Sequence, residues 1–228
     1  MIEFLFLDLD DTILDFAQAE RAALSRTLVA FGVEPTEDRI RQYSRINMDC
    51  WKRMERGELT RDQLRTVRFR EFFAGQGIEA DVEAVAKAYV ENLAVGHWFL
   101  PGAEEAVRRL SKKYRLFLAS NGMESVQRGR MTSAGLYPYF EQSFVSEEMG
   151  VSKPSKAYFD AAFARIEGFD PARAMMVGDS LTSDIRGGIN AGIRTCWVNP
   201  GSKKRRADTV PDYEITALSE LEALLETL

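Results

Sequence analysis

At 228 residues and 45% hydrophobic content, the chain can bury one substantial core and an accessory unit, which excludes several independent domains. The 30 Lys and Arg residues against 35 Asp and Glu give a formal net charge of -5, which provides no general attraction to nucleic acid or to an anionic membrane. No apolar run approaches the roughly 20 residues needed to cross a bilayer, and the amino terminus lacks the basic start of a signal peptide, so we expect a cytoplasmic protein.

The amino terminus predicts a buried strand. Residues 2–7 are almost entirely apolar, as in strands of a parallel sheet that are covered on both faces. The run ends abruptly in Asp8-Leu9-Asp10-Asp11-Thr12, which marks the carboxyl end of the strand. In open α/β sheets, ligands bind at that edge.

Residues 15–97 predict helices. Apolar residues recur at spacings near three and four, as in Ile40, Tyr43 and Ile46, and no convincing strand interrupts them. Glycines and a proline punctuate the stretch as helix ends or turns. We therefore expect a helical cap domain of about four helices at residues 15–97, inserted into a core domain formed by residues 1–14 and 98–228.

After Pro101-Gly102, strands and helices alternate again. Amphipathic helices separate short apolar runs, which predict strands at residues 116–119, 144–145, 174–177, 195–198 and 213–215. Alternation of this kind implies right-handed crossovers between parallel strands. The predicted fold class is α/β, a doubly wound, Rossmann-like and mostly parallel sheet with an inserted all-helical cap.

Polar segments follow several of the predicted strands. They are Asp8 to Thr12, Ser120-Asn121-Gly122, Lys153-Pro154, and Gly178-Asp179-Ser180 with Asp184. Parallel strands would bring all of these segments to one edge of the sheet. Asp8 and Asp10 are two residues apart, so in extended backbone their side chains point the same way.

The acidic residues of these segments predict a metal site. If Asp8, Asp10, Asp179 and Asp184 converge, their charges repel strongly unless some protonate or a cation neutralises them. Oxygen ligands without clustered His or Cys favour Mg²⁺ over zinc or copper, and Mn²⁺ accepts the same ligands. Magnesium commonly binds carboxylates together with substrate phosphate, so the pattern indicates phosphoryl chemistry.

In this order, the segments resemble the motifs of the haloacid dehalogenase-like hydrolase superfamily: D-x-D-x-T, a later Ser or Thr, a Lys, and an acidic segment of the G-D-x-x-x-x-D type. The resemblance implies a phosphatase in which Asp8 is the nucleophile. Asp10 would protonate the leaving alkoxide and later act as base toward water. Covalent catalysis of this kind splits one difficult displacement into two easier ones.

The same resemblance implies the ligands of the metal. Mg²⁺ would bind the carboxylates of Asp8 and Asp179 and the backbone carbonyl of Asp10. Asp184 would support the ion directly or through water.

The resemblance also implies how the phosphate is held. Ser120 and the amide of Asn121 would bind it, and Lys153 would act as a catalytic residue that offsets charge on Asp8 and on the transferring group. Fixed donors and cations aimed at the phosphoryl oxygens are the main assistance that proteins give to phosphoryl transfer.

Two features narrow the function within the superfamily. Its dehalogenases lack the second acid of the first motif, because a departing halide needs no proton, and Asp10 is present here. The helical insertion resembles caps that close over small soluble substrates and exclude water. We therefore expect a small phosphorylated metabolite as substrate, with no nucleic-acid or membrane partner, and a monomer or small homo-oligomer.

A closer resemblance is to the bacterial 5′-nucleotidases that act on pyrimidine and non-standard nucleoside monophosphates. It rests on the stretches Ile46 to Trp51 with Gly57 and Leu59-Thr60, Val145 to Val151, and Gly187 to Gly192 with Thr195-Cys196-Trp197. The substrate would then be a nucleoside monophosphate. Asn47 and Trp51 are candidate substrate-binding residues, since an aromatic ring can stack on a base.

Several residues also have simpler interpretations. Trp51 lies on an apolar helical stripe, so core packing explains it as well as substrate contact does. The run from Lys203 to Arg206 is more typical of a solvated face than of a nucleic-acid site. Close packing of a helix on the sheet explains the glycines between Gly187 and Gly192 better than a nucleotide-binding loop.

Two alternative functions remain open at this point. One is a phosphatase or phosphomutase for a sugar phosphate or another small metabolite, which would use the same aspartyl phosphate. The other is a non-catalytic relative that binds a ligand. The chain has the expected motif residue at every catalytic position, which disfavours this alternative.

Overall fold

The structure is a computed structural model that describes residues 1–201 and 207–228. The basic run from Lys203 to Arg206, weighed above as a solvated face, lies outside the described residues. The chain divides into two compact units. One consists of residues Met1–Phe16 and His97–Leu228, and the other of residues Ala17–Gly96.

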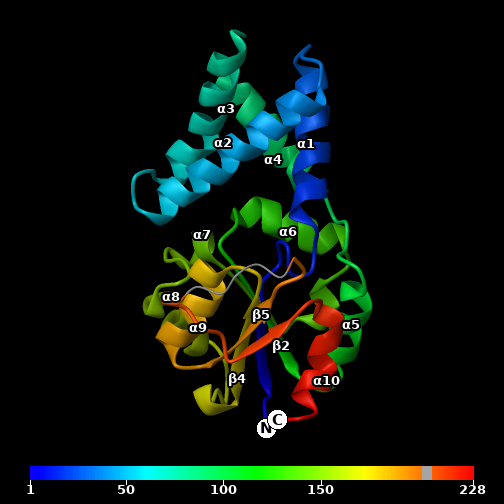
Figure 1. Ribbon diagram of the computed structural model, residues 1–228, viewed down its shortest axis with the longest axis vertical. Helices are drawn as coiled ribbons and strands as arrows, with labels where there is room; N and C mark the ends of the chain where they lie inside the picture. Colours follow the sequence, from blue (N-terminus) through cyan, green and yellow to red (C-terminus); the bar gives the residue numbers. More distant parts are fainter. Residues whose placement is uncertain (202–206) are drawn as a thin grey trace. The chain divides into compact units, whose positions relative to one another are not determined.

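The first unit is built on a parallel sheet (Figure 1). Among the described residues, six strands follow the order β3-β2-β1-β4-β5-β6, and every neighbouring pair is parallel. The strands are β1 (Phe4–Leu7), β2 (Arg115–Ser120), β3 (Gln142–Val145), β4 (Ala174–Gly178), β5 (Arg194–Val198) and β6 (Tyr213–Ile215). The predicted doubly wound α/β sheet is thus confirmed. β1 begins two residues later than its apolar run, because its pairing partners in β2 and β4 begin opposite Phe4.

The central strands send alternate side chains into two apolar layers. On β1, Leu5 and Leu7 join one layer, whereas Phe4 and Phe6 join the other. Strands β2 and β4 alternate in the same way. Because both faces of the sheet are buried, these strands are apolar throughout, which is the pattern from which the sequence predicts them.

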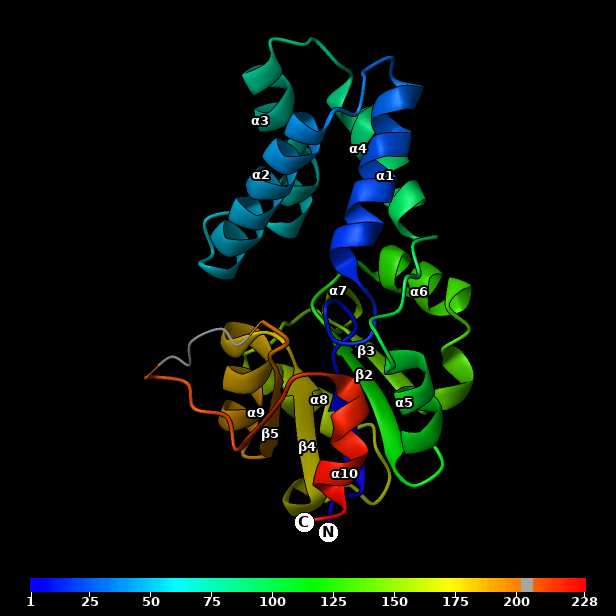
Figure 2. The same ribbon diagram turned by 45° about the vertical axis from the view of Figure 1, so that its right-hand side comes forward.

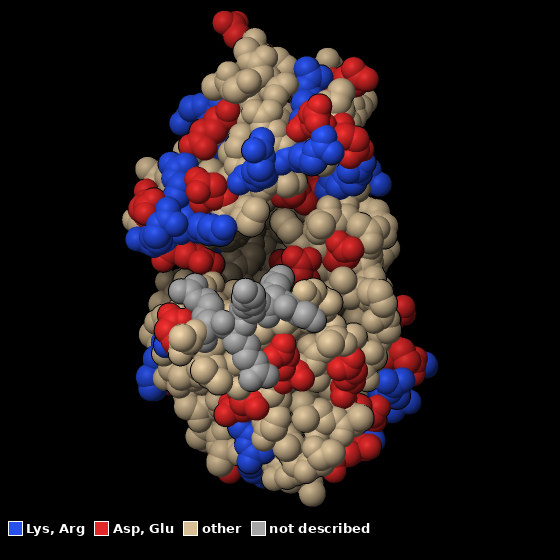
Figure 3. Space-filling view, viewed as in Figure 1, with Lys and Arg blue, Asp and Glu red and all other residues tan. Residues whose placement is uncertain are grey.

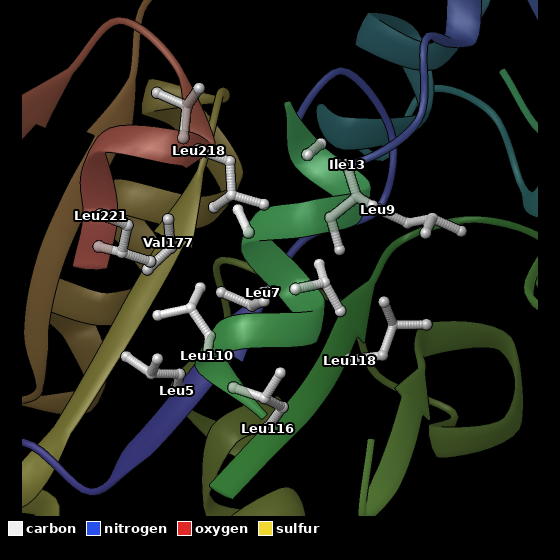
Figure 4. Packing of buried hydrophobic residues seen from close by; sticks show 14 of the residues in the cluster. Leu5, Leu7, Leu9, Ile13, Leu110, Leu116, Leu118, Val177, Leu218 and Leu221 are labelled. Carbon is white, nitrogen blue, oxygen red and sulfur yellow. The ribbon is translucent and has the colours of Figure 1, made fainter. Parts of the chain in front are cut away.

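Helices cover both faces of the sheet (Figure 2). α5 (Ala103–Leu110) and α10 (Leu221–Leu225) pack on the leucine-rich layer, whose side chains interdigitate in Figure 4. α8 (Lys156–Phe163) and α9 (Arg186–Ala191) cover the phenylalanine-rich layer. The remaining helical segments of this unit are α6 (Glu124–Ser133), α7 (Ser146–Met149), η1 (Tyr137–Tyr139), η2 (Pro171–Arg173), η3 (Leu181–Ile185) and η4 (Leu218–Glu220).

The second unit is helical, as the sequence predicts. All of its residues are described, and its helices are α1 (Phe16–Ala30), α2 (Glu37–Glu55), α3 (Arg61–Gln76) and α4 (Val82–Leu93). Thr60 starts α3 with a reciprocal hydrogen-bond pair to Gln63, and Gly77 ends it at a φ of 64°. The rings of Tyr43, Phe69 and Tyr89 form its aromatic centre, with centroids 5.0–5.5 Å apart.

Charges of both signs are interspersed over the face of the molecule seen in Figure 3. Many pair across neighbouring elements, for example Arg53 with Glu71 at 2.8 Å and Lys113 with Glu222 at 2.8 Å. Such exposed pairs contribute little stability, on the order of 0–1 kcal/mol each. Within residues 1–201 and 207–228, no helix combines the length and the apolar character needed to cross a membrane.

The strand order determines where the polar segments meet. The chain runs outward from β1 through β2 to β3, and then returns to the other side of β1 with β4. In open α/β sheets, a reversal of this kind creates the ligand-binding position at the carboxyl ends of the strands. The loops that follow β1, β2 and β4 are therefore neighbours, and they contain Asp8, Ser120 and Asp179.

Glycines between Gly187 and Gly192 allow α9 to approach the sheet. A Cβ atom added at Gly188 would lie 2.6 Å from Cγ2 of Thr195 and 3.1 Å from Cβ of Met176. A Cβ atom at Gly187 would lie 2.7 Å from the ring of Phe159. Close helix packing therefore accounts for these glycines, as the sequence analysis favours.

This packing predicts that Gly188→Ala destabilises the protein. Overpacking of a core costs about 1–3 kcal/mol, while alanine returns about 1 kcal/mol of helix propensity, so a net loss of up to about 2 kcal/mol is expected. Urea unfolding monitored by circular dichroism measures it. Gly75→Ala in α3 is the matched control, since the added Cβ would meet only the end of the flexible Gln42 side chain. Equal stability of the two variants would contradict the packing argument.

Candidate active site

The polar segments after the strands converge at the carboxyl edge of the sheet. Asp8 follows β1 directly, Ser120 is the last residue of β2, and Asp179 follows β4. Lys153 comes from the loop after α7, and Asp184 comes from η3. Contacts of Lys153 with Asp8 and Asp184, and the proximity of Asp179 to both acids, join these segments into one cluster.

Lys153 lies at the centre of the cluster. Its ammonium group donates to Oδ1 of Asp8 at 2.8 Å, to Oδ1 of Asp184 at 2.6 Å, and to the carbonyl oxygen of Ala119. Its side chain is 1% exposed. A charge removed from water in this way is tolerated only when it is paired and hydrogen-bonded, and three acceptors meet that condition.

The buried charges shift each other's pKa values. Burial raises the pKa of the Asp8 carboxyl group well above its usual range; the Lys153 ammonium opposes this shift, and the carboxylates of Asp184 and Asp10 add to it. Burial lowers the pKa of the Lys153 ammonium, but Asp184 and Asp8 outweigh that effect and leave the pKa raised. Lys153 is therefore protonated at neutral pH, and the cluster favours additional positive charge beside Asp8.

Asp8, Asp179 and Asp184 could hold a metal ion. Each offers a carboxylate oxygen, and the three oxygens all lie within 4.8 Å of one another. The donor set consists of oxygen atoms, which suits a hard divalent cation. The indole Nε1 of Trp197, on β5, donates to the backbone oxygen of Asp179 at 2.8 Å and so fixes the backbone there.

Gly178 leaves room for the carboxylate of Asp184. A Cβ atom added at Gly178 would lie 2.2 Å from Oδ2 of Asp184, so the carboxylate occupies the space that a side chain would fill. The same Oδ2 accepts the backbone N–H of Ser180 at 3.0 Å. Glycine at the end of β4 is therefore required for Asp184 to reach Lys153.

Asp10 has different surroundings from Asp8. Its Oδ2 accepts a hydrogen bond from Nε2 of Gln127 at 2.7 Å, and its Oδ1 forms an ion pair with the guanidinium group of Arg130. Its carboxylate does not belong to the group of three described acids that could hold a metal, and the metal contact predicted for Asp10 involves its backbone carbonyl instead.

Gln127 and Arg130 are not among the site residues predicted from the sequence. Both lie on the inner face of α6, between the apolar residues Val126 and Met131. A signal was available, because two large polar residues three positions apart interrupt the apolar stripe of this helix. That signal gives no partner, since Asp10 lies 117 positions before Gln127 in the sequence.

Ser120 and Asn121 are held by neighbouring loops. The hydroxyl oxygen of Ser120 accepts Nε2 of Gln127 at 2.8 Å and the N–H of Gly122 at 3.1 Å. The side-chain amide of Asn121 donates to the backbone oxygen of Lys153 and accepts its N–H, both at 2.9 Å. This reciprocal pair ties the loop after β2 to the loop that contains Lys153.

Asn47 and Trp51, the predicted substrate-binding residues, belong to α2 in the helical unit. Asn47 is buried. Its side-chain amide donates a hydrogen bond to Oε1 of Glu20 at 2.7 Å and accepts one from NH1 of Arg68 at 3.0 Å. Its amide is thus part of a hydrogen-bonded network inside that unit. Trp51 is only partly buried.

Comparison with known proteins identifies relatives over nearly the full length. A model of the haloacid dehalogenase-like hydrolases matches residues 2–192. The HAD-hydrolase YfnB of Bacillus subtilis is 39% identical, over 97% of this chain and 94% of that protein. The pyrimidine 5′-nucleotidase PynA of Streptococcus pneumoniae is 36% identical over 96% and 93%, and the pyrimidine 5′-nucleotidase YjjG of Escherichia coli is 31% identical over 98% and 97%.

A solved structure has the same fold. The crystal structure of YfnB from Bacillus subtilis bound to magnesium superposes with a TM-score of 0.94 at 38% identity. The match covers 98% of each chain. The arrangement of elements in this chain is therefore shared with an experimentally determined hydrolase structure.

The carboxylate cluster predicts that Mg²⁺ stabilises the protein and that Asp179→Asn removes this effect. Binding at about 100 times the dissociation constant adds about 2.7 kcal/mol, which corresponds to a rise in Tm on the order of 5–10 °C for a chain of this size. Thermal unfolding with Mg²⁺ and with a chelator measures it. Asp160→Asn, which changes an exposed acid on α8, should retain the full rise. The same Mg²⁺ response in both variants would exclude Asp179 as a ligand.

Proposed function

The chain belongs to the haloacid dehalogenase-like hydrolase family, and we propose that it is a magnesium-dependent phosphomonoesterase that forms an aspartyl phosphate on Asp8. The observation that carries this proposal is the buried contact of Asp8 with the Lys153 ammonium at 2.8 Å, beside two further carboxylates. A nucleophilic carboxylate next to fixed positive charge is the arrangement that attack on an anionic phosphate ester requires.

The donor set supports a Mg²⁺ site at this edge. Asp8, Asp179 and the backbone carbonyl of Asp10 would be its ligands, with Asp184 supporting the ion directly or through water. When bound, the ion supplies positive charge that offsets both the clustered carboxylates and the phosphoryl oxygens. Mn²⁺ would serve the same oxygen ligands.

In the first step, a carboxylate oxygen of Asp8 attacks phosphorus while the bond to the ester oxygen breaks. Asp10, in its protonated form, gives its proton to that leaving oxygen, which departs as an alcohol. The products are an aspartyl phosphate on Asp8 and an ionised Asp10. No phosphate has yet been released.

In the second step, water attacks phosphorus of the aspartyl phosphate. The ionised Asp10 takes a proton from this water, and the bond between phosphorus and the Asp8 oxygen breaks. Inorganic phosphate leaves, Asp8 is again a carboxylate, and Asp10 is again protonated. Each residue has then returned to its starting state.

Ser120, the backbone amide of Asn121 and Lys153 would hold the phosphoryl oxygens during both steps. Hydrogen bonds that hold these residues in place support this role. Ser120 is hydrogen-bonded to Gln127, and Asn121 is hydrogen-bonded to the backbone of Lys153. Donors that are already oriented need no reorganisation when charge develops on the phosphoryl group.

We propose that the substrate is a nucleoside 5′-monophosphate with a pyrimidine or non-standard base. The relatives PynA and YjjG, both named pyrimidine 5′-nucleotidases, support this assignment. Residues 15–97 would form the cap that selects the substrate, with Asn47 and Trp51 as its proposed nucleoside contacts. To contact a ligand, Asn47 must exchange its hydrogen bonds to Glu20 and Arg68, whereas Trp51 is only partly buried.

The mechanism predicts that Asp8→Asn retains the fold but loses at least about 10³-fold in kcat. The amide cannot attack phosphorus, while its size and burial are almost unchanged. Phosphate release measures the loss, and circular dichroism verifies folding. Acid quenching of the wild-type enzyme with ³²P-labelled substrate should leave label on the peptide that contains Asp8. A fully active Asp8→Asn variant would contradict the nucleophile assignment.

The substrate assignment predicts a ranking of activities. Phosphate release should be fastest with pyrimidine nucleoside 5′-monophosphates, slower with purine nucleotides and sugar phosphates, and absent when a chelator removes the metal. A panel of monophosphates at equal concentration tests this ranking through kcat/KM. A clear preference for sugar phosphates would exclude the nucleotidase assignment but leave the phosphatase mechanism intact. Phosphoryl transfer to a second sugar without net release would indicate a mutase.

A further inference from the structure

The inner face of α6 contains two polar side chains that take no direct part in the two chemical steps. Gln127 is 1% exposed and Arg130 is fully buried, although buried positions on helices are usually apolar. A buried guanidinium group is costly unless it is paired. Both side chains point to a single acid, Asp10.

The two residues contact different oxygens of that acid. Gln127 donates from Nε2 to Oδ2 of Asp10 at 2.7 Å, and Arg130 forms its ion pair with Oδ1. The guanidinium carbon of Arg130 also lies 5.8 Å from the ring centroid of Phe16. A carboxylate with a polar contact at each oxygen has little freedom to rotate, so α6 sets the orientation of the Asp10 carboxylate.

Gln127 also connects Asp10 to the residue expected to bind phosphate. The same Nε2 that contacts Asp10 lies 2.8 Å from Oγ of Ser120. Gly122 leaves room for this link, since a Cβ atom added there would lie 2.2 Å from Nε2 of Gln127. The position of the acid is therefore tied to the position of the phosphoryl group.

We propose that Arg130 and Gln127 are positioning residues that aim the carboxyl group of Asp10 at the ester oxygen of the substrate. This inference rests on the proposed phosphomonoesterase function. Arg130 is completely buried, so it acts through Asp10 and not by touching substrate. Asp10 itself is 29% exposed at its side chain, which leaves it accessible to the leaving group and to water.

Two kinds of ester separate this role from a general structural one. The alcohol released from uridine 5′-monophosphate needs a proton as it leaves, whereas p-nitrophenyl phosphate releases a stabilised phenolate that does not. Since kcat/KM covers only the steps up to departure of the alcohol, it isolates the acid role of Asp10. Misdirection of Asp10 should therefore affect the first ester much more than the second.

The test uses the full chain with Mg²⁺. In Arg130→Met, kcat/KM for uridine 5′-monophosphate should fall about 10–100-fold, while kcat/KM for p-nitrophenyl phosphate should change less than about threefold. Ribose 5-phosphate replaces the nucleotide if it proves the better substrate. Arg128→Met is the matched control on the same helix, because Arg128 is 54% exposed and pairs with Glu124 and Glu148.

A double variant provides a second criterion. If Arg130 acts only through Asp10, then Arg130→Met should cause no further loss in kcat/KM when it is added to Asp10→Asn. Arg130→Lys should recover part of the activity, since a lysine supplies the charge but lacks the planar fork of arginine. Equal losses on both esters, or additive losses in the double variant, would overturn the proposal.

Alternative variants and the activity of the wild-type enzyme separate the possible outcomes. If Arg130→Met does not fold, as judged by circular dichroism, then Gln127→Leu and Arg130→Lys carry the same comparison between the two esters. If the wild-type enzyme hydrolyses no monophosphate with Mg²⁺, the proposed function has failed. If the wild type is active and the variants lose both activities equally, only the role of α6 has failed.

Discussion

The carboxyl edge of the sheet is organised around one buried ammonium group. Lys153 contacts Asp8 at 2.8 Å and Asp184 at 2.6 Å, and removal of either acid would leave less compensation for a charge that is hidden from water. The neighbouring loops serve this arrangement. Asn121 holds the backbone of Lys153 from both its N–H and its carbonyl, and Gly178 leaves the space in which Asp184 reaches the ammonium.

The two acids of the first motif, Asp8 and Asp10, have different surroundings. Asp8 faces Lys153 and the cluster of carboxylates, where burial raises its pKa and where a cation is favoured. Asp10, two residues later, faces Gln127 and Arg130 on α6 instead. Enzymes commonly assign different roles to paired carboxylates through such differences in environment. Here Asp8 lies in the carboxylate cluster, and Asp10 lies apart from it against α6.

Glycines at and near this site leave space that neighbouring groups occupy. At Gly178 the vacated space is occupied by Asp184, and at Gly122 it is occupied by the amide of Gln127. Gly188 allows α9 to rest against Thr195 and Met176. In each case a side chain or helix packs where a Cβ atom would otherwise stand, so these positions link backbone packing directly to the geometry of the polar groups.

Local pattern was enough to predict the six strands and the helical insertion, because strands buried on both faces are largely apolar. The family was assigned from the resemblance of its motifs, in their order along the chain. Local pattern was enough to nominate Asp8, Lys153 and Asp179 as neighbours, since parallel strands end at a common edge. The partners of Asp10 could not be read in this way. Contacts between Asp10 and α6 span more than a hundred residues, and periodicity reports that a side chain faces inward without reporting what it meets. The burial of Asn47 between Glu20 and Arg68 likewise depends on three helices packing together, which no spacing within α2 reveals.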